Sequence, residues 1–132
     1  MLLLDTNICI YMINANRPSV TLKLKENDVR NLKISSITVG ELFFGIEKSQ
    51  RKEENEHRIR KFLSPFEIID FNSNDAIRYA RIRSTLQKKG NLIGPYDMLI
   101  AAQAISRSWT IITNHEKEFT RVEGLKVENW VK

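Results

Sequence analysis

The chain opens with Met1-Leu2-Leu3-Leu4-Asp5-Thr6-Asn7, a run of apolar residues that polar residues follow at once. A run this short and this uniformly apolar is typical of a strand that a parallel sheet buries on both faces. Residues 32–35, 67–70, 109–113 and 125–127 are further short segments with the composition of strands. The sequence therefore predicts five short strands.

Helical patterns fill the stretches between these strands. Thr38-Val39-Gly40-Glu41 resembles a capping box that opens a helix to about residue 49, and Ser73 or Asn74 is expected to cap a long basic helix. The other predicted helices cover residues 7–15, 18–25, 52–63 and 95–105. Strands that alternate with helices indicate right-handed crossovers and a parallel sheet covered on both sides, an α/β fold. In such sheets ligands bind beyond the carboxyl ends of the strands.

Length and composition narrow the class of protein. The chain has 132 residues, of which 42% are apolar and 28% charged, as expected for one folded domain over residues 1–132. No apolar stretch approaches the roughly 18 residues that cross a bilayer, and we expect no export and no membrane partner. One cysteine and two histidines exclude an internal disulfide and a zinc-type cluster. We therefore expect a protein of the reducing cytoplasm.

Positive charge is concentrated in one segment. The chain carries a formal net charge of +5, and residues 76–96 contain five basic residues and no acid. At 100° per residue, Arg78, Arg81, Lys88 and Lys89 fall on one side of a helix. Such a stripe suits the backbone of a nucleic acid, and a solvated helix face would show the same pattern.

Acidic side chains are predicted to meet at the carboxyl edge of the sheet. Asp5 ends the first strand, Glu41 lies on the first turn of the helix after the second strand, and Asp97 lies on the first turn of the helix that opens at Pro95. Each of them could simply cap a helix. If all three converge at about 5 Å, each pair repels by roughly 3 kcal/mol at an effective dielectric constant of about 20. Mg²⁺ or Mn²⁺ would offset this repulsion, which on a basic domain favours a metal-dependent nuclease.

The same motifs support a resemblance to a known family. The chain resembles the VapC toxins, which are PIN-domain ribonucleases of type II toxin–antitoxin pairs. The resemblance spans essentially the whole chain and rests on residues 2–8, 34–42, 93–97 with 100–102, 113–114 with 118–119, and 124–130. It implies a three-layer α/β/α fold around a short parallel sheet, and an acidic pocket that holds Mg²⁺ or Mn²⁺.

The resemblance also assigns site residues. Asp5, Glu41 and Asp97 occupy the three acidic positions of the family. Many PIN domains carry a fourth acid where this chain has His115, so Glu118 is the leading substitute. Glu116 is a weaker candidate for that fourth position, and the residues expected to support the ligating carboxylates or the scissile phosphate are Thr6, Asn7, Thr113 and Asn114.

What the resemblance implies about activity is specific. It implies endonucleolytic cleavage of RNA that leaves a 5′-phosphate and a 3′-hydroxyl. It suggests tRNA as the substrate, with the anticodon loop of an initiator tRNA as the leading expectation. It also implies a homodimer that a cognate VapB-like antitoxin inhibits by covering the acidic pocket.

Three alternatives remain open at the level of the sequence. A haloacid-dehalogenase phosphatase would carry a second aspartate where this chain has Asn7, and a receiver domain would carry an adjacent acidic pair on its first strand. A non-catalytic RNA-binding module would use the basic stripe alone and would not need Asp5. Separately, Phe43, Phe44 and Ile46 on the helix of Glu41 could form a surface for a partner.

Overall fold

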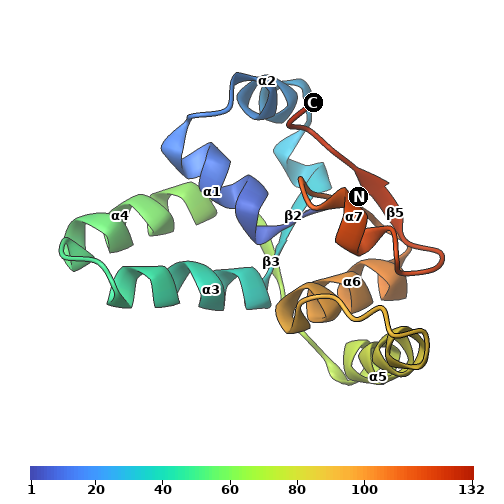
Figure 1. The fold of residues 1–132 in the computed structure, drawn as a ribbon. Helices are drawn as coiled ribbons and strands as arrows, with labels where there is room; N and C mark the ends of the chain where they lie inside the picture. Colours follow the sequence, from blue (N-terminus) through green and yellow to red (C-terminus); the bar gives the residue numbers. More distant parts are fainter.

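Five short strands form one parallel sheet in the computed structural model, which describes residues 1–132 (Figure 1). The strands are β1 (Leu2–Leu4), β2 (Leu32–Ser35), β3 (Glu67–Ile69), β4 (Thr110–Ile112) and β5 (Lys126–Glu128). They lie in the order β3-β2-β1-β4-β5, and every neighbouring pair is parallel. The predicted parallel α/β fold is confirmed.

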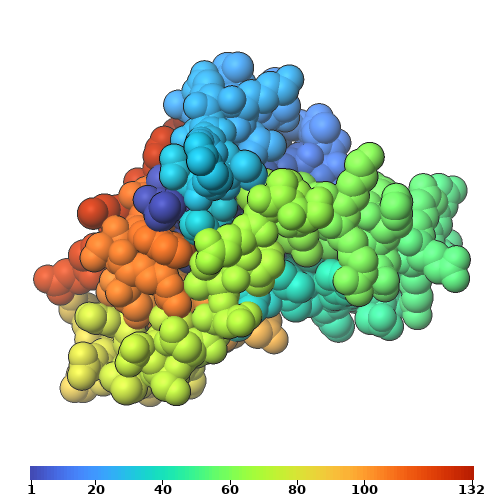
Figure 2. Space-filling model, turned by 180° about the vertical axis from the view of Figure 1, so that it is seen from behind, coloured from blue at the N-terminus to red at the C-terminus, as the bar shows by residue number.

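Helices cover both faces of this sheet. One layer consists of α1 (Thr6–Asn14), α2 (Pro18–Glu26), α3 (Ser36–Glu47) and α4 (Lys52–Leu63). The other consists of α5 (Ser73–Lys88), α6 (Pro95–Arg107) and the short α7 (Glu116–Phe119). Helices α3 and α4 lie side by side and project from the rest of the molecule, as Figures 1 and 2 show. The arrangement is therefore a three-layer α/β/α fold.

The alternation of side chains along the central strands creates two separate cores. Leu3 and Ile111 point into the core beneath α5 and α6, whereas Leu4 and Ile112 point into the core beneath α1 to α4. All four side chains are fully buried. This burial on both faces explains why apolar residues follow one another without alternation in β1 and at the end of β4.

The structure corrects three local predictions. Helix α3 begins at Ser36, and the Ser35 hydroxyl caps it by accepting the backbone N–H of Ile37 at 2.9 Å, so the expected box at Thr38 does not form and Glu41 lies in the second turn. Helix α5 is capped by Asn72 in a reciprocal capping box with Asp75, instead of by Ser73 or Asn74. Two short elements were not predicted, namely α7 and a 3₁₀ helix over Val29–Asn31.

The strand order places a crevice at the carboxyl end of β1. From β1 the chain continues outward through β2 and β3, and it later returns to the other side of β1 with β4 and β5. The helices that follow β1 and β4 cover opposite faces, α1 in one layer and α7 in the other. Such a reversal point is where open α/β sheets bind ligands. None of the helices has the length and apolarity that crossing a membrane requires.

Candidate active site

Asp5 stands directly after β1 and caps helix α1. Its Oδ1 accepts the backbone N–H of Ile8 at 2.9 Å, and its Oδ2 accepts the Thr113 hydroxyl at 2.5 Å. Asp5 is only 3% exposed. Burial raises the pKa of Asp5 above its ordinary value, although these two hydrogen bonds oppose the shift. The carboxyl group is thus held in one orientation at the end of the central strand.

Glu41 reaches the same region from α3. Its Oε1 accepts the Thr6 hydroxyl at 2.7 Å, and Thr6 Oγ1 lies 3.0 Å from Thr38 Oγ1. A threonine has one hydroxyl hydrogen, so Thr6 donates to Glu41 and accepts from the buried Thr38. This chain of hydrogen bonds joins the start of α1 to α3 and orients Glu41.

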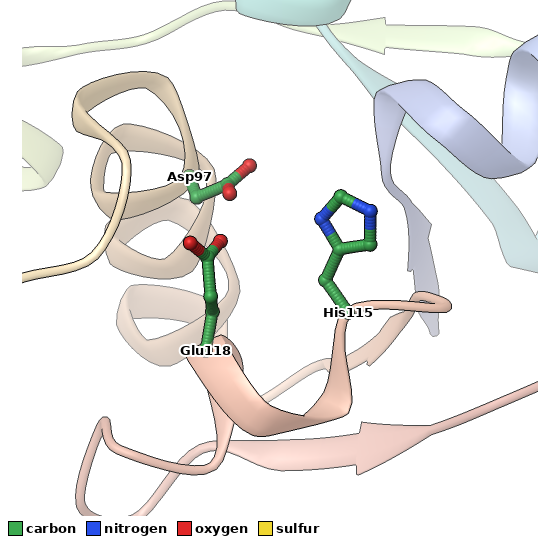
Figure 3. Close-up of side chains that lie close together, drawn as sticks. All are labelled: Asp97, His115 and Glu118. Carbon is green, nitrogen blue, oxygen red and sulfur yellow. The ribbon is translucent and has the colours of Figure 1, made fainter.

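Asp97, Glu118 and His115 form a cluster opposite Asp5. Asp97 lies in the first turn of α6, Glu118 belongs to α7, and His115 precedes that helix. One potential ligand atom from each of the three lies within 4.8 Å of the others, and Figure 3 shows the side chains pointing toward a common space. Burial, the hydrogen bond and charge of Glu118, and the charges of Asp5 and Glu41 raise the pKa of Asp97 to about 8. Without a cation, a proton therefore stays on this pair at neutral pH.

His115 is oriented by its neighbours. Asn7 Nδ2 lies 2.8 Å from His115 Nε2, and because the amide nitrogen can only donate, the neutral ring carries its hydrogen on Nδ1. The backbone N–H of His115 donates to Thr113 Oγ1 at 2.8 Å. One ring nitrogen faces the carboxyl groups of Asp97 and Glu118 and the other turns away from them (Figure 3). Thr113 thus connects Asp5 to the segment that carries His115.

The acidic side chains meet in a cavity of about 910 Å³, which we call the acidic cavity. Asp5, Glu41, Asp97 and His115 line it, and so do the expected supporting residues Thr6 and Asn7. The structure thus brings together three carboxylates that are separated by up to 92 positions in the chain.

The other acids near α7 are placed differently. Glu116 Oε2 lies 2.7 Å from Lys132 Nζ and accepts Asn129 Nδ2 at 3.2 Å, which lowers the pKa of Glu116. Asn129 also donates to Asn114 Oδ1 at 3.4 Å, and Asn114 does not line the acidic cavity. Glu118 is consequently the acid of this segment that faces Asp97, while Glu116 is held by a lysine.

The donor set of the cavity fits a hard divalent cation. Eight ion pairs occur in the chain, and none of them includes Asp5, Glu41, Asp97 or Glu118. Asp5, Glu41 and Asp97 line the cavity and Glu118 lies beside it against Asp97, so four carboxyl groups without an ion-pair partner leave a net negative site. All-oxygen donors are the ligands that Mg²⁺ and Mn²⁺ prefer over zinc.

Comparison with known proteins identifies the family. The PIN domain model matches residues 2–125. Ribonuclease VapC2 of Rickettsia felis is 43% identical over 134 residues, covering 98% of each chain. The tRNA(fMet)-specific endonuclease VapC of Salmonella typhimurium is 39% identical over 97% of this chain and 96% of its own. The chain is a PIN-domain member of the VapC ribonucleases. The crystal structure of DNA-bound VapBC from Salmonella typhimurium matches 98% of this chain with a TM-score of 0.92 at 39% identity, covering 97% of that chain.

Membership of the VapC family decides between the alternatives that the sequence left open. It confirms the expected ribonuclease and excludes the phosphatase and the receiver domain. The PIN-domain family is typically metal-dependent, in agreement with the donor set of the acidic cavity.

A second groove of this VapC-family chain is basic. It has a volume of about 210 Å³, and its lining includes Arg78 and Arg81 of α5 together with Arg121, which follows α7. We call it the arginine groove. The two lysines of the predicted stripe, Lys88 and Lys89, are exposed but lie outside it.

Two contributors to these sites were missed by the sequence analysis. Thr38 was expected to cap a helix but instead supports Thr6, a role that depends on how α1 and α3 pack. Arg121 lies outside the basic segment and reaches the arginine groove because the chain folds back after α7. Neither role has a local sequence signal.

The surface that Phe43, Phe44 and Ile46 of α3 were expected to offer a partner is largely not exposed. Ile46 is buried in the core, and Phe43 packs against that core with Arg60 over its ring. Only Phe44 is exposed.

Proposed function

We propose that the chain is a Mg²⁺- or Mn²⁺-dependent endoribonuclease whose acidic cavity cleaves RNA. The observation that carries the proposal is the gathering of four carboxyl groups, free of ion pairs, at the reversal point of a parallel sheet. Asp5, Glu41 and Asp97 are the proposed metal ligands, and Glu118 is the fourth catalytic acid.

Each polar residue of the cavity has a defined task in this proposal. Bound Mg²⁺ or Mn²⁺ supplies the charge that polarises a phosphodiester and generates hydroxide from water at neutral pH. Thr113 and Thr6 hold Asp5 and Glu41 in the orientation that ligation needs. Asn7 donates to His115 Nε2, which leaves the Nδ1–H of His115 to donate to the scissile phosphate from the rim.

We propose that the basic face of α5 binds the RNA backbone. Arg78, Arg81, Lys88 and Lys89 are all exposed, so their charge is available to phosphates. Arg121 extends this surface across the arginine groove. Binding through these residues should depend on salt and not on base sequence.

The substrate that we propose is tRNA, with the anticodon loop of initiator tRNA as its leading site. This choice rests on the Salmonella typhimurium relative, which is named a tRNA(fMet)-specific endonuclease. Cleavage should leave a 5′-phosphate and a 3′-hydroxyl.

We further propose that the chain works in the cytoplasm as a homodimer and that a cognate VapB-like antitoxin inhibits it. The support is the Salmonella typhimurium structure, which contains VapBC. Adding the purified antitoxin should stop cleavage, and light scattering of the free chain should give twice its mass.

The decisive experiment is cleavage of total RNA by wild type, Asp5→Asn and Asp97→Asn, each with Mn²⁺ and with EDTA, followed by sequencing of the new ends. Asn at position 5 keeps an oxygen that can cap α1, so the fold should persist. Glu53→Gln, on an exposed turn of α4, is the control for loss of one acid. Wild type and Glu53→Gln should cut only with Mn²⁺. Equal cutting by all four proteins, or cutting in EDTA, would contradict the proposal.

A further inference from the structure

Two exposed aromatic rings stand at the rim of the acidic cavity. Phe44 is 63% exposed and Tyr96 is 57% exposed, and both line the cavity. They are the only aromatic side chains among the large exposed apolar residues, because the others are at least partly buried. Phe44 belongs to α3 and Tyr96 to the first turn of α6, so the rings come from different walls. The two most exposed aromatic rings of the chain therefore both line the cavity that holds the carboxylates.

A positive charge accompanies one of these rings. Lys48 Nζ lies 4.6 Å from the centroid of Phe44, and Lys48 also lines the cavity. It forms no ion pair with an acid. An exposed ring that carries an unpaired cation over one of its faces offers a nucleotide a surface for its base and a charge for its phosphate.

Space beside these groups is kept open by two glycines of α3. Gly40 and Gly45 line the same cavity, and a Cβ placed on either would meet no atom within 4 Å. Glycine in a helix interior is less stable than alanine, and no packing contact in the chain requires its small size here. The open space is therefore available to a ligand that lies against α3.

We propose that the rim of the acidic cavity binds single-stranded RNA, with the bases on either side of the scissile phosphate stacked on Phe44 and Tyr96. Lys48 binds a neighbouring phosphate, and the backbone passes over Gly40 and Gly45. This inference rests on the proposed nuclease function and adds how the substrate is held. It assigns a role in substrate choice to Phe44 and Tyr96, which lie on the same helices as the proposed metal ligands Glu41 and Asp97.

RNA fits this surface better than a protein segment does for two reasons. The rings share a cavity with the carboxylates, so a base on them belongs to the same strand as the phosphate at the cation. Bases of a duplex are stacked on each other and cannot reach the rings, whereas bases of a loop can be splayed onto aromatic side chains. The rim therefore selects unpaired RNA.

The first test is RNA binding by metal-free protein that carries Asp5→Asn. A labelled single-stranded oligoribonucleotide that spans a wild-type cleavage site is titrated, and the same strand annealed to its complement is the comparison. Phe44→Ala and Tyr96→Ala should each weaken single-strand binding about 5- to 150-fold, and Phe44→Trp should restore it. Leu22→Ala removes an equally exposed apolar side chain from α2, outside the cavity, and should change nothing.

Several outcomes of this titration would overturn the inference. Unchanged binding by both alanine variants would do so, and so would equal affinity for the duplex. If Phe44→Ala and Tyr96→Ala weaken only the binding of the cognate antitoxin, the rim is a protein-docking surface and the RNA proposal fails.

A second test removes the base instead of the ring. An abasic nucleotide on the side of the cut that faces Phe44 should slow cleavage by wild type with Mn²⁺, and Phe44→Ala should lose no further activity on that substrate. If the abasic nucleotide and Phe44→Ala each lower the cleavage rate by factors that multiply, the ring and the base do not interact. If wild type cuts no RNA at all, the proposed function fails; if it cuts and the alanine variants cut equally well, only the stacking inference fails.

The glycines give an independent readout. Gly40→Ala and Gly45→Ala should raise the melting temperature, because alanine favours the helix, and should weaken single-strand binding by occupying the strand's path. Higher stability with unchanged RNA binding would contradict the proposed path along α3.

Discussion

Asp75 and Asp97 lie in the first turns of the adjacent helices α5 and α6, yet their surroundings are opposite. Asp75 is fully buried and accepts two hydrogen bonds from Arg107, at 2.8 and 3.1 Å, and one from the backbone of Asn72. Burial raises the pKa of Asp75, but the bonds from Arg107 and Asn72 lower it further than burial raises it. Asp97 forms no ion pair with a lysine or an arginine, and its pKa is raised to about 8.

The contrast distinguishes Asp75, whose carboxylate stabilises the fold, from Asp97, whose carboxyl group is available to a cation. Asp75 has its counter-charge within the chain, so its cost of burial is offset on folding. Asp97 and the acids around it have no lysine or arginine within ion-pair distance, so the metal-free fold keeps a proton on the Asp97–Glu118 pair until a cation replaces it. The proposed functional site is therefore the one whose carboxyl groups have no lysine or arginine partner within the chain.

Removing the two carboxylates should affect stability differently. Asp75→Asn leaves Arg107 without its partner and should lower the free energy of unfolding by about 3–5 kcal/mol. Asp97→Asn relieves repulsion and should leave that free energy unchanged or raised. Urea unfolding in EDTA measures the free energy of unfolding of both variants. An equal loss in the two would contradict the proposed difference between the sites.

Thr113 should matter for the ligand more than for the fold. Thr113→Val removes the hydroxyl that Asp5 accepts and should weaken Mn²⁺ binding by about 10- to 100-fold, as expected for a group that orients a ligand. Thr110→Val, at the start of the strand that Thr113 follows, is the control, since the Thr110 hydroxyl makes no side-chain hydrogen bond. Calorimetric titration compares the two variants with wild type, and equal affinities for all three proteins would argue against Thr113 as a support for Asp5.

The metal-free protein should lose stability as the pH rises. Asp97 holds a proton in the folded state up to about pH 8 but releases it near pH 4 when unfolded, so the folded state binds more protons in between. Its contribution is fully present below about pH 4 and is lost as the pH rises toward 8, while the buried Asp5 acts in the same direction. Thermal melts in EDTA from pH 5 to 8 should show this decline, and Asp97→Asn should flatten it. A wild-type melting temperature that rises with pH would contradict the raised pKa.

The arginine groove should contribute the smallest effect, because its charges are exposed. Arg121→Gln should lower the slope of log affinity against log salt by about 0.7, the value for one phosphate contact on single-stranded RNA. Lys25→Gln, at an exposed position of α2 in the other helical layer, should leave the slope unchanged. Binding to inactive Asp5→Asn protein across a salt series measures both slopes, and equal slopes for the two variants would remove the groove from the RNA path.

Much of the fold could be predicted because its signals are local. Leu2, Leu3 and Leu4 show a strand buried on both faces, and Pro95 marks the first residue of α6. The start of α3 was predicted wrongly because Ser35 and Thr38 both offer capping hydroxyls, and only packing against Thr6 decides between them.

The site was predictable in part for the same reason. Asp5 and Asp97 stand next to strong local signals, and the order of strands brings them together. Other contacts depend on how the segment around α7 folds back. These are the proximity of Glu118 to Asp97, the ion pair of Glu116 with Lys132, and the position of Arg121 in the arginine groove. No local pattern encodes such contacts.

The most direct measurement is the number of protons released when Mn²⁺ binds. Titrating metal-free protein at pH 7 in buffers of different ionisation enthalpy should give saturable binding with release of about one proton per cation, since the proton on Asp97 must leave. Asp97→Asn should bind more weakly and release none. Absence of saturable binding, or the same proton count in wild type and Asp97→Asn, would show that the uncompensated carboxylates are not a cation site.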